Sequence, residues 1–178
     1  MFNKKYVVTA ITLGLIAAAS AGLVAGANLL TREKIKQNEI EKINNGMSNI
    51  FGKTELKYTE KSASEAGLSG YKYVQTLYTV KDNTDTLVGY ALKTSGSNMY
   101  GKITLIVGVD KTNYSFVKLS VVVNEQTYAS TLVDNYINPL NDGGNIDDVS
   151  CGATYGAKLV RDMVTEATDA ASKATWGA

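Results

Sequence analysis

The feature that most constrains the fold is a long uncharged stretch near the N-terminus. The chain has 178 residues, and no Asp, Glu, Lys or Arg occurs from Tyr6 to Leu30. A helix over this stretch would be roughly 37 Å long at 1.5 Å per residue, which is enough to cross a hydrocarbon core of ~30 Å. A buried helix of a soluble protein is rarely this long and this apolar. We therefore predict a membrane anchor over residues 1–30.

A cleaved signal peptide is the main alternative to a retained anchor. Lys4 and Lys5 supply the basic start of a signal peptide, and Ala19-Ser20-Ala21 is similar to a cleavage site. The apolar stretch nevertheless continues to Leu30, well beyond the end that a signal peptide needs, which favours a retained anchor. The numbers of Lys and Arg residues on the two flanks do not decide the orientation.

Composition excludes several kinds of chemistry. The chain has no histidine and a single cysteine, Cys151. Ser-His-Asp catalysis, Cys-His catalysis, the usual zinc sites and an intrachain disulfide are therefore excluded. The net charge is +1 and no basic run is present, so nothing supports nucleic-acid binding. We expect no catalytic side chain, no metal site and no nucleic-acid partner.

The residues after the anchor predict one α+β domain. An amphipathic connecting helix is expected over residues 31–52, and the domain proper over 53–178. Residues 53–70 look like a loop with a short element. Strands are expected at 71–80, 86–94, 102–109 and 116–123, and helices at 129–140, ending at Pro139, and at 155–174. Because the turns between the strands are short, we predict a largely antiparallel sheet with flanking helices.

The segment before the last predicted helix is the best candidate for a site. It reads Asp148-Val149-Ser150-Cys151-Gly152-Ala153-Thr154. Gly152 and Ala153 are small, so a bulky group can approach the backbone, and Gly152 can adopt a positive φ. The Thr154 hydroxyl beside a helix N-terminus is well placed to hold a phosphate, because unpaired N–H groups and the helix dipole favour negative charge there. The alternative is that Thr154 is simply an N-cap residue.

This segment resembles the attachment motif of the covalent FMN-binding domain family, Asp-x-x-(Ser/Thr)-Gly-Ala-Thr. In that family the last threonine carries FMN through a phosphoester bond, so the resemblance implies FMN on Thr154. Two positions depart from the family pattern. Cys151 occupies the Ser/Thr position, and Gly156 stands where the family usually has Ser or Thr.

The chain is most similar to the G subunit of Rnf-type ion-translocating complexes, which are related to the C subunit of sodium-translocating NADH–quinone oxidoreductase. Two further matches are Asn28-Leu29-Leu30-Thr31-Arg32 after the anchor and Val107-Gly108-Val109-Asp110 at the end of a strand. The family's Glu-Thr-x-Gly turn corresponds to Glu125-Gln126-Thr127-Tyr128-Ala129. There Thr127 is retained, Gln126 replaces the acid and the glycine is absent.

The resemblance implies an electron-transfer subunit, anchored in the cell membrane with its C-terminal domain outside the cytoplasm. The implied partners are the other membrane redox subunits of an Rnf-type complex, which couples ferredoxin/NAD electron transfer to ion translocation, and a flavin transferase for maturation. Such a subunit is a redox component of a translocase and not an autonomous enzyme. Two alternatives stay open: a stand-alone membrane-anchored extracytoplasmic flavoprotein carrier, and a non-redox anchored binding protein.

The resemblance also extends the set of candidate cofactor-binding residues. Besides Thr154 it contains Asp148, Cys151, Gly152, Ala153, Thr127 and Tyr155. Asp148 could contact the transferase or shape the loop, and Thr127 could contact the flavin or only stabilise its turn. The candidates for packing on the isoalloxazine ring are Tyr100, Tyr128 and Tyr155. The alternative for each is an ordinary strand or surface aromatic residue, because the chain has eleven tyrosines.

Overall fold

The computed structural model describes residues 4–176. The chain separates into two units, Met1–Glu41 and Lys42–Ala178. The first helix, α1 (Lys4–Phe51), runs through the first unit and into the second. The helix continues without a break past residue 30.

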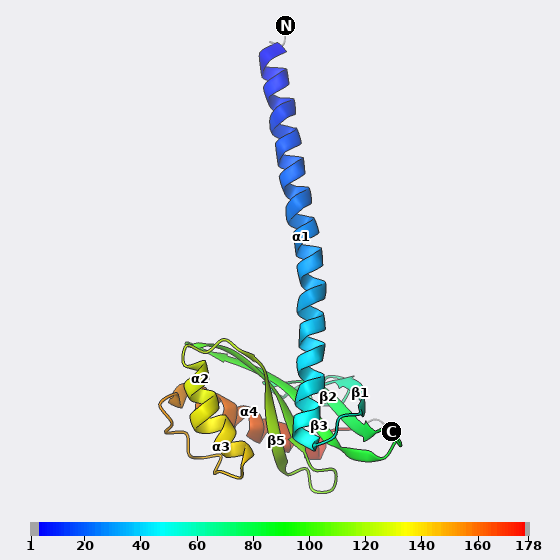
Figure 1. Cartoon of the computed structure of the whole chain (residues 1–178), viewed down its shortest axis with the longest axis vertical. Helices are drawn as coiled ribbons and strands as arrows, with labels where there is room; N and C mark the ends of the chain where they lie inside the picture. Colours follow the sequence, from blue (N-terminus) through cyan, green and yellow to red (C-terminus); the bar gives the residue numbers. More distant parts are fainter. Residues whose placement is uncertain (1–3, 177–178) are drawn as a thin grey trace. The chain divides into compact units, whose positions relative to one another are not determined.

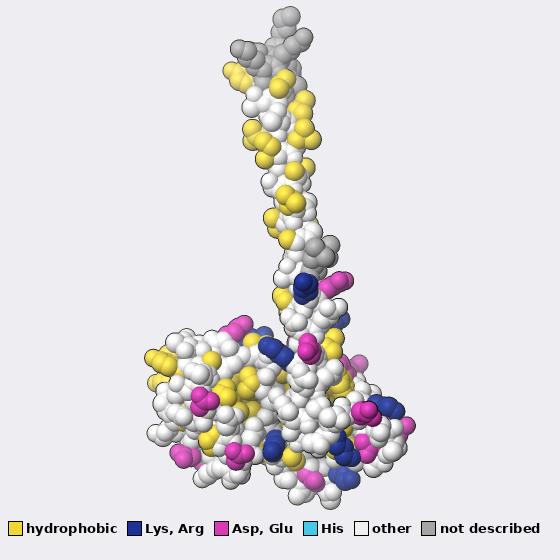
Figure 2. Space-filling view, viewed as in Figure 1, with side chains coloured by type: hydrophobic (Ala, Val, Ile, Leu, Met, Phe, Trp, Pro, Cys, Tyr) yellow, Lys and Arg dark blue, Asp and Glu magenta, His cyan; other side chains and the backbone are white. Residues whose placement is uncertain are grey.

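The described part of the first unit is helical throughout. From residue 11 to residue 28 every side chain is exposed, and none of them is charged. Figure 2 shows only hydrophobic and uncharged surface along this part of the helix. Within residues 4–176, α1 is the one helix long and apolar enough to cross a membrane, and a window of 18 residues in it has a mean hydropathy of 1.8. Length and composition therefore fit the expected anchor.

The second unit is built on a five-stranded antiparallel sheet with strand order β1-β2-β3-β4-β5. The strands are β1 (Leu56–Ser62), β2 (Val74–Asp82), β3 (Leu87–Asn98), β4 (Gly101–Val109) and β5 (Phe116–Asn124). Each strand pairs with the next one along the chain, as short connections require. The predicted α+β class and the antiparallel hairpins are confirmed.

Two strand boundaries differ from the prediction. Strand β1 lies within the stretch that was expected to be mostly loop. The sequence did not predict it, because this edge strand carries Lys57, Glu60 and Lys61 and lacks the apolar alternation that is typical of a strand. Strand β3 continues through residues 95–98, beyond the expected end at residue 94. These residues pair one by one with β4, from Ser95 opposite Thr104 to Asn98 opposite Gly101, so backbone pairing sustains the strand without apolar side chains.

The helical segment after β5 also differs from the prediction. It consists of α2 (Ala129–Leu132), a π-helical turn η1 (Val133–Ile137) and α3 (Asn138–Asn141). Pro139 was expected to end the helix but lies in the first turn of α3. Proline is tolerated there because its missing N–H is not needed, and the π-helical turn just before it shifts the hydrogen-bond register.

The sheet is covered on both faces, so successive residues of its central strands enter different cores. Leu105 and Val107 face one core, and Ile106 between them faces the other. The larger core contains α4 (Thr154–Lys173) and the α2–α3 segment, and the smaller one contains the last turns of α1 through Ile43 and Met47. Figure 1 shows the sheet between α4, coloured orange to red, and the cyan end of α1.

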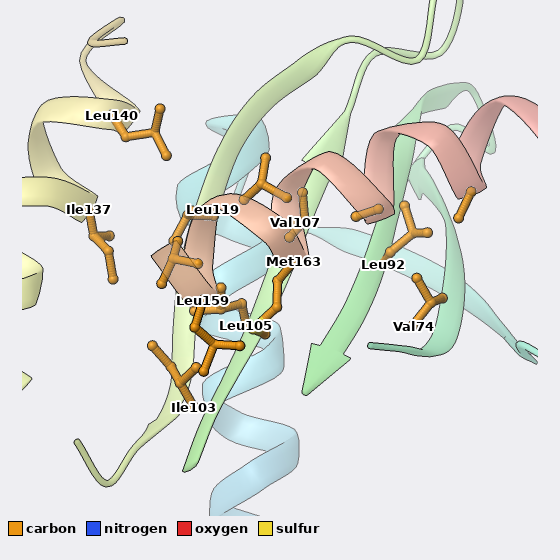
Figure 3. Packing of buried hydrophobic residues seen from close by; sticks show 14 of the residues in the cluster. Val74, Leu92, Ile103, Leu105, Val107, Leu119, Ile137, Leu140, Leu159 and Met163 are labelled. Atoms are coloured by element: carbon orange, nitrogen blue, oxygen red, sulfur yellow. The ribbon is translucent and has the colours of Figure 1, made fainter. Parts of the chain in front are cut away.

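Helix α4 is amphipathic, and its apolar face packs on the middle of the sheet. Its buried residues recur at helical spacing, including Leu159, Val160, Met163, Val164 and Ala167. Figure 3 shows Leu159 and Met163 directed towards strand β4. This packing holds the first turn of α4 at one end of the sheet, where β3 and β4 are joined.

The C-terminal segment is tied to the opposite end of the sheet. Trp176 stacks on Tyr90 with ring centroids 4.1 Å apart, and its indole N–H donates to the carbonyl oxygen of Ala171 at 2.9 Å. Tyr114 extends the stack. Trp176 therefore fastens the end of α4 to the sheet.

Glu166 joins α4 to the beginning of β2. Its Oε1 accepts hydrogen bonds from the N–H groups of Tyr73 at 2.5 Å and Val74 at 3.2 Å. We expect Glu166→Ala to lower the free energy of unfolding by about 2–3 kcal/mol, because two partly buried donors lose a charged acceptor. Thermal unfolding of the full chain in detergent measures this, with the exposed neighbour Thr165→Ala as the matched control. A Glu166→Ala variant as stable as the control would contradict the expectation.

Candidate functional site

A pocket of about 280 Å³ lies at the end of the sheet beside the first turn of α4. Three segments far apart in sequence form it: the β3–β4 turn, the stretch from the end of β5 into α2, and the Gly-Ala-Thr segment with the start of α4. The lining residues are Tyr100, Gln126, Tyr128, Leu132, Gly152, Ala153, Thr154, Tyr155 and Gly156. The pocket therefore contains Thr154, the residue that the sequence motif singles out.

Thr154 is the first residue of α4 and is partly buried in the pocket wall. Ala153 occupies the N-cap position, so the interpretation of Thr154 as an N-cap residue is wrong. Among the described residues, none forms a hydrogen bond with the Thr154 hydroxyl. The hydroxyl therefore has no structural task in this part of the chain and is available to a ligand.

The N-terminus of α4 has no side-chain cap. The first N–H group of α4 that donates a backbone hydrogen bond is that of Ala157, which binds the carbonyl oxygen of Ala153 at 3.0 Å. Within residues 4–176, the N–H groups of Thr154, Tyr155 and Gly156 find no acceptor. Unpaired N–H groups at the start of a 20-residue helix favour an anion, and a phosphate ester at Thr154 would lie beside them.

Three tyrosines gather at the pocket from three different elements. The ring of Tyr100 lies 5.5 Å from that of Tyr155 and 6.2 Å from that of Tyr128, measured between centroids, and the rings are tilted by 41° and 57°. Tyr128 and Tyr155 are more than half exposed. Aromatic surface of this kind, partly open to solvent, suits the packing of a flat conjugated ring.

Hydrogen bonds fix the β3–β4 turn that carries Tyr100. The Asn98 side chain accepts from the Tyr100 N–H at 2.8 Å and donates to the carbonyl oxygen of Tyr155 at 3.1 Å. Thr127 donates its N–H to the carbonyl oxygen of Tyr100 at 2.9 Å and its hydroxyl to the same oxygen at 3.3 Å. Thr127 itself is not among the lining residues. It stabilises the turn, and its contact with a flavin stays a prediction.

The other residues of the motif divide into two groups. Gly152 lines the pocket with a φ of +82°, a conformation that favours glycine, and buried Ala153 lies next to it. Asp148 is exposed on the preceding loop and does not line the pocket. Cys151 is a free, partly buried thiol outside the lining, and its carbonyl oxygen accepts from the Asn135 side chain at 3.1 Å.

Three lining residues were not predicted as site residues: Gln126, Leu132 and Gly156. Gln126 stands on the turn that resembles the family's Glu-Thr-x-Gly, so the sequence held a signal for it. Gly156 lies against Leu132, and a Cβ at this position would come within 2.9 Å of the Leu132 Cδ2. The absence of a side chain at 156 thus lets α4 pack closely on α2.

No Lys, Arg, Asp or Glu is among the residues that line the pocket. Its polar groups are tyrosine hydroxyls, the Gln126 carboxamide, the Thr154 hydroxyl and backbone N–H groups. Such a pocket supplies ring-packing surface and hydrogen-bond donors, and it has no side-chain base for covalent catalysis.

The fold and the pocket define a class of protein: an α+β domain with an apolar N-terminal helix and an aromatic pocket around a free threonine hydroxyl. Within that class, residues 1–50 match the family model of the RnfG N-terminal region. A search among curated proteins finds no match to the chain. The chain is thus similar to RnfG over its helical N-terminal part, and this match together with the apolar helix supports membrane anchoring.

Proposed function

We propose that the chain is the flavin-carrying G-type subunit of an Rnf-type membrane complex, with FMN attached through its phosphate to Thr154. The observation that carries the proposal is the free Thr154 hydroxyl in an aromatic pocket at an uncapped helix N-terminus. The match of residues 1–50 to the RnfG N-terminal region supports it from the other end of the chain.

The pocket offers suitable groups for the phosphate and for the ring of FMN. The unpaired N–H groups of residues 154–156 would hold the phosphate and offset its charge. Tyr100, Tyr128 and Tyr155 would pack on the isoalloxazine ring. When bound, FMN supplies the chemistry, because flavins accept and release one or two electrons.

The chain's own residues would tether and orient the cofactor. A covalent link at Thr154 prevents loss of FMN by diffusion, which matters most for a domain outside the cytoplasm, and we propose this location for residues 53–178. The exposed rims of Tyr128 and Tyr155 leave one side of the pocket open to solvent, so a redox partner could approach the ring. The proposal gives no side chain a catalytic role.

A flavin assay tests the proposal directly. The full chain is produced with and without an active flavin transferase, separated by denaturing electrophoresis and viewed under ultraviolet light. We expect fluorescence, and a mass increase of one FMN phosphoester, only with the transferase. A transferase-treated chain of unmodified mass and without fluorescence would sink the flavin proposal and favour a non-redox anchored binding protein.

Complex membership and orientation need a second measurement. An affinity-tagged chain in native membranes is expected to co-purify with other membrane redox subunits, and protease added to intact cells with a permeabilised outer layer is expected to reach the C-terminal domain. Recovery of the flavinylated chain alone would instead indicate a stand-alone membrane-anchored carrier.

A further inference from the structure

Gln126 is one of three polar or charged residues among the buried residues of the described chain, and it lines the pocket. Its side chain is 6% exposed, and its Nε2 donates a hydrogen bond to the carbonyl oxygen of Gly101. Its backbone N–H donates to the Asn124 side chain at 3.1 Å. The Gln126 carboxamide thus binds the start of β4. In the family that the chain resembles, this position is an acid.

The hydrogen bond from Gln126 completes a set that holds the β3–β4 turn. Next to it, the Thr127 N–H binds the carbonyl oxygen of Tyr100 at 2.9 Å, so two consecutive carbonyls of the turn are held by two consecutive residues. The turn cannot relax away from this segment without leaving a buried amide unpaired, which is costly.

Gln126 also faces the first turn of α4. Its Oε1 lies 3.4 Å from the position of a Cβ at Gly156, within ordinary contact distance. The Gln126 side chain is therefore bonded to the turn that carries Tyr100 and lies close to the first turn of α4, which carries Thr154 and Tyr155.

We propose that Gln126 is a positioning residue of the pocket: its carboxamide holds the β3–β4 turn, and through it Tyr100, against the first turn of α4. As far as the ring of a bound flavin is concerned, the inference rests on the function proposed above. The hold on the turn itself is a property of the chain and can be tested without a flavin.

The chemistry of a carboxamide makes the proposal specific. Only the Nε2 of Gln126 can donate to a carbonyl oxygen, and an ionised glutamate has acceptors alone. In Gln126→Glu a carboxylate would face the Gly101 carbonyl, and the contact would return only when the acid is protonated. Burial raises the pKa of such a carboxyl group above that of an exposed glutamate, so the contact is expected to be lost as the pH rises.

The test compares Gln126→Glu with Gln126→Met, which keeps the length of the side chain but has no hydrogen bond to offer. Each full-length variant is produced with the flavin transferase, purified in detergent and examined from pH 5 to pH 8. The native flavin fluorescence is measured, because stacking on tyrosine quenches it. Hydrogen exchange of the peptide over residues 98–103 is measured on the same samples and needs no flavin.

Exchange is expressed as protection relative to the intrinsic rate of an unstructured amide at each pH, because that intrinsic rate itself rises with pH. In these terms we expect both readouts of the wild type to be insensitive to pH. Gln126→Met should show at least about two-fold higher native fluorescence and faster exchange at every pH. Gln126→Glu should resemble the wild type at low pH and Gln126→Met at high pH. The other ionisable groups near Gln126 are the three pocket tyrosines and the exposed Lys102 and Glu125.

Each outcome decides something. Wild-type exchange and fluorescence in both variants at every pH would overturn the role of Gln126 even if the chain is fully flavinylated. Absence of flavin from the wild type would refute the proposed function, while the exchange data would still decide whether Gln126 holds the turn. If Gln126→Met does not fold, the recovery of Gln126→Glu at low pH remains the deciding comparison.

Discussion

Thr154→Ala is expected to carry no covalent flavin, whereas Thr154→Ser will retain it. The phosphoester needs a hydroxyl at this position, and serine supplies one on the same backbone. Because the Thr154 hydroxyl has no hydrogen bond to the described residues, its loss should change the free energy of unfolding by no more than ~0.5 kcal/mol. The measurements are fluorescence after denaturing electrophoresis and the intact mass of the protein.

A matched control separates the hydroxyl at this site from threonines in general. Thr165 is an exposed residue of the same helix, and Thr165→Ala should be flavinylated like the wild type. A flavin still attached to Thr154→Ala would place the link elsewhere and remove the argument for this pocket. A Thr154→Ala variant that loses both flavin and fold would contradict the statement that the hydroxyl has no structural task.

Gly101→Ala is expected to cause the largest loss of stability of the substitutions considered. Gly101 has a φ of +133°, and a Cβ there would lie 2.1 Å from the carbonyl oxygen of Glu125, a backbone atom that cannot move aside cheaply. The turn would have to open, which breaks the hydrogen bond from the Glu125 N–H to the Lys102 carbonyl oxygen. We expect a loss of about 3 kcal/mol or more, or roughly 10 °C in the thermal midpoint.

Gly143→Ala is the control for this prediction. Gly143 also has a positive φ, +94°, but nothing lies within 4 Å of the position of its Cβ. Only backbone strain remains there, which costs about 1–2 kcal/mol. Thermal unfolding of the full chain in detergent compares the two variants. Equal losses would show that strain alone, and not the clash with Glu125, explains the effect at Gly101.

The sequence predicts those strands whose apolar side chains indicate that the strand is buried. Residues 103–107 are apolar except for Thr104, because β4 pairs with a strand on each side and is covered on both faces. Strand β1 and the end of β3 carry polar side chains and exist because a neighbouring strand offers backbone partners. Periodicity cannot detect a strand of that kind, since the information lies in the partner.

The candidate site divides in the same way. Thr154, Gly152 and Ala153 could be predicted because the attachment motif is local, and small residues before a helix have a local physical meaning. No local sequence pattern indicates that Gln126 or Leu132 lies next to Thr154 in the fold. Tyr100 and Tyr128 could hardly be distinguished from the other tyrosines, of which the chain has eleven in all. Asp148 and Cys151 belong to the motif by spacing, yet the fold leaves them outside the pocket lining.

The sequence by itself thus determined the apolar helix, the antiparallel order of the central strands and the threonine that would carry a cofactor, because each depends on residues close together in the chain. The tertiary structure decided what surrounds that threonine. Packing of α4 on the sheet brings its first turn to the end where β3 joins β4, and only this long-range contact places Tyr100, Gln126 and Tyr128 around Thr154.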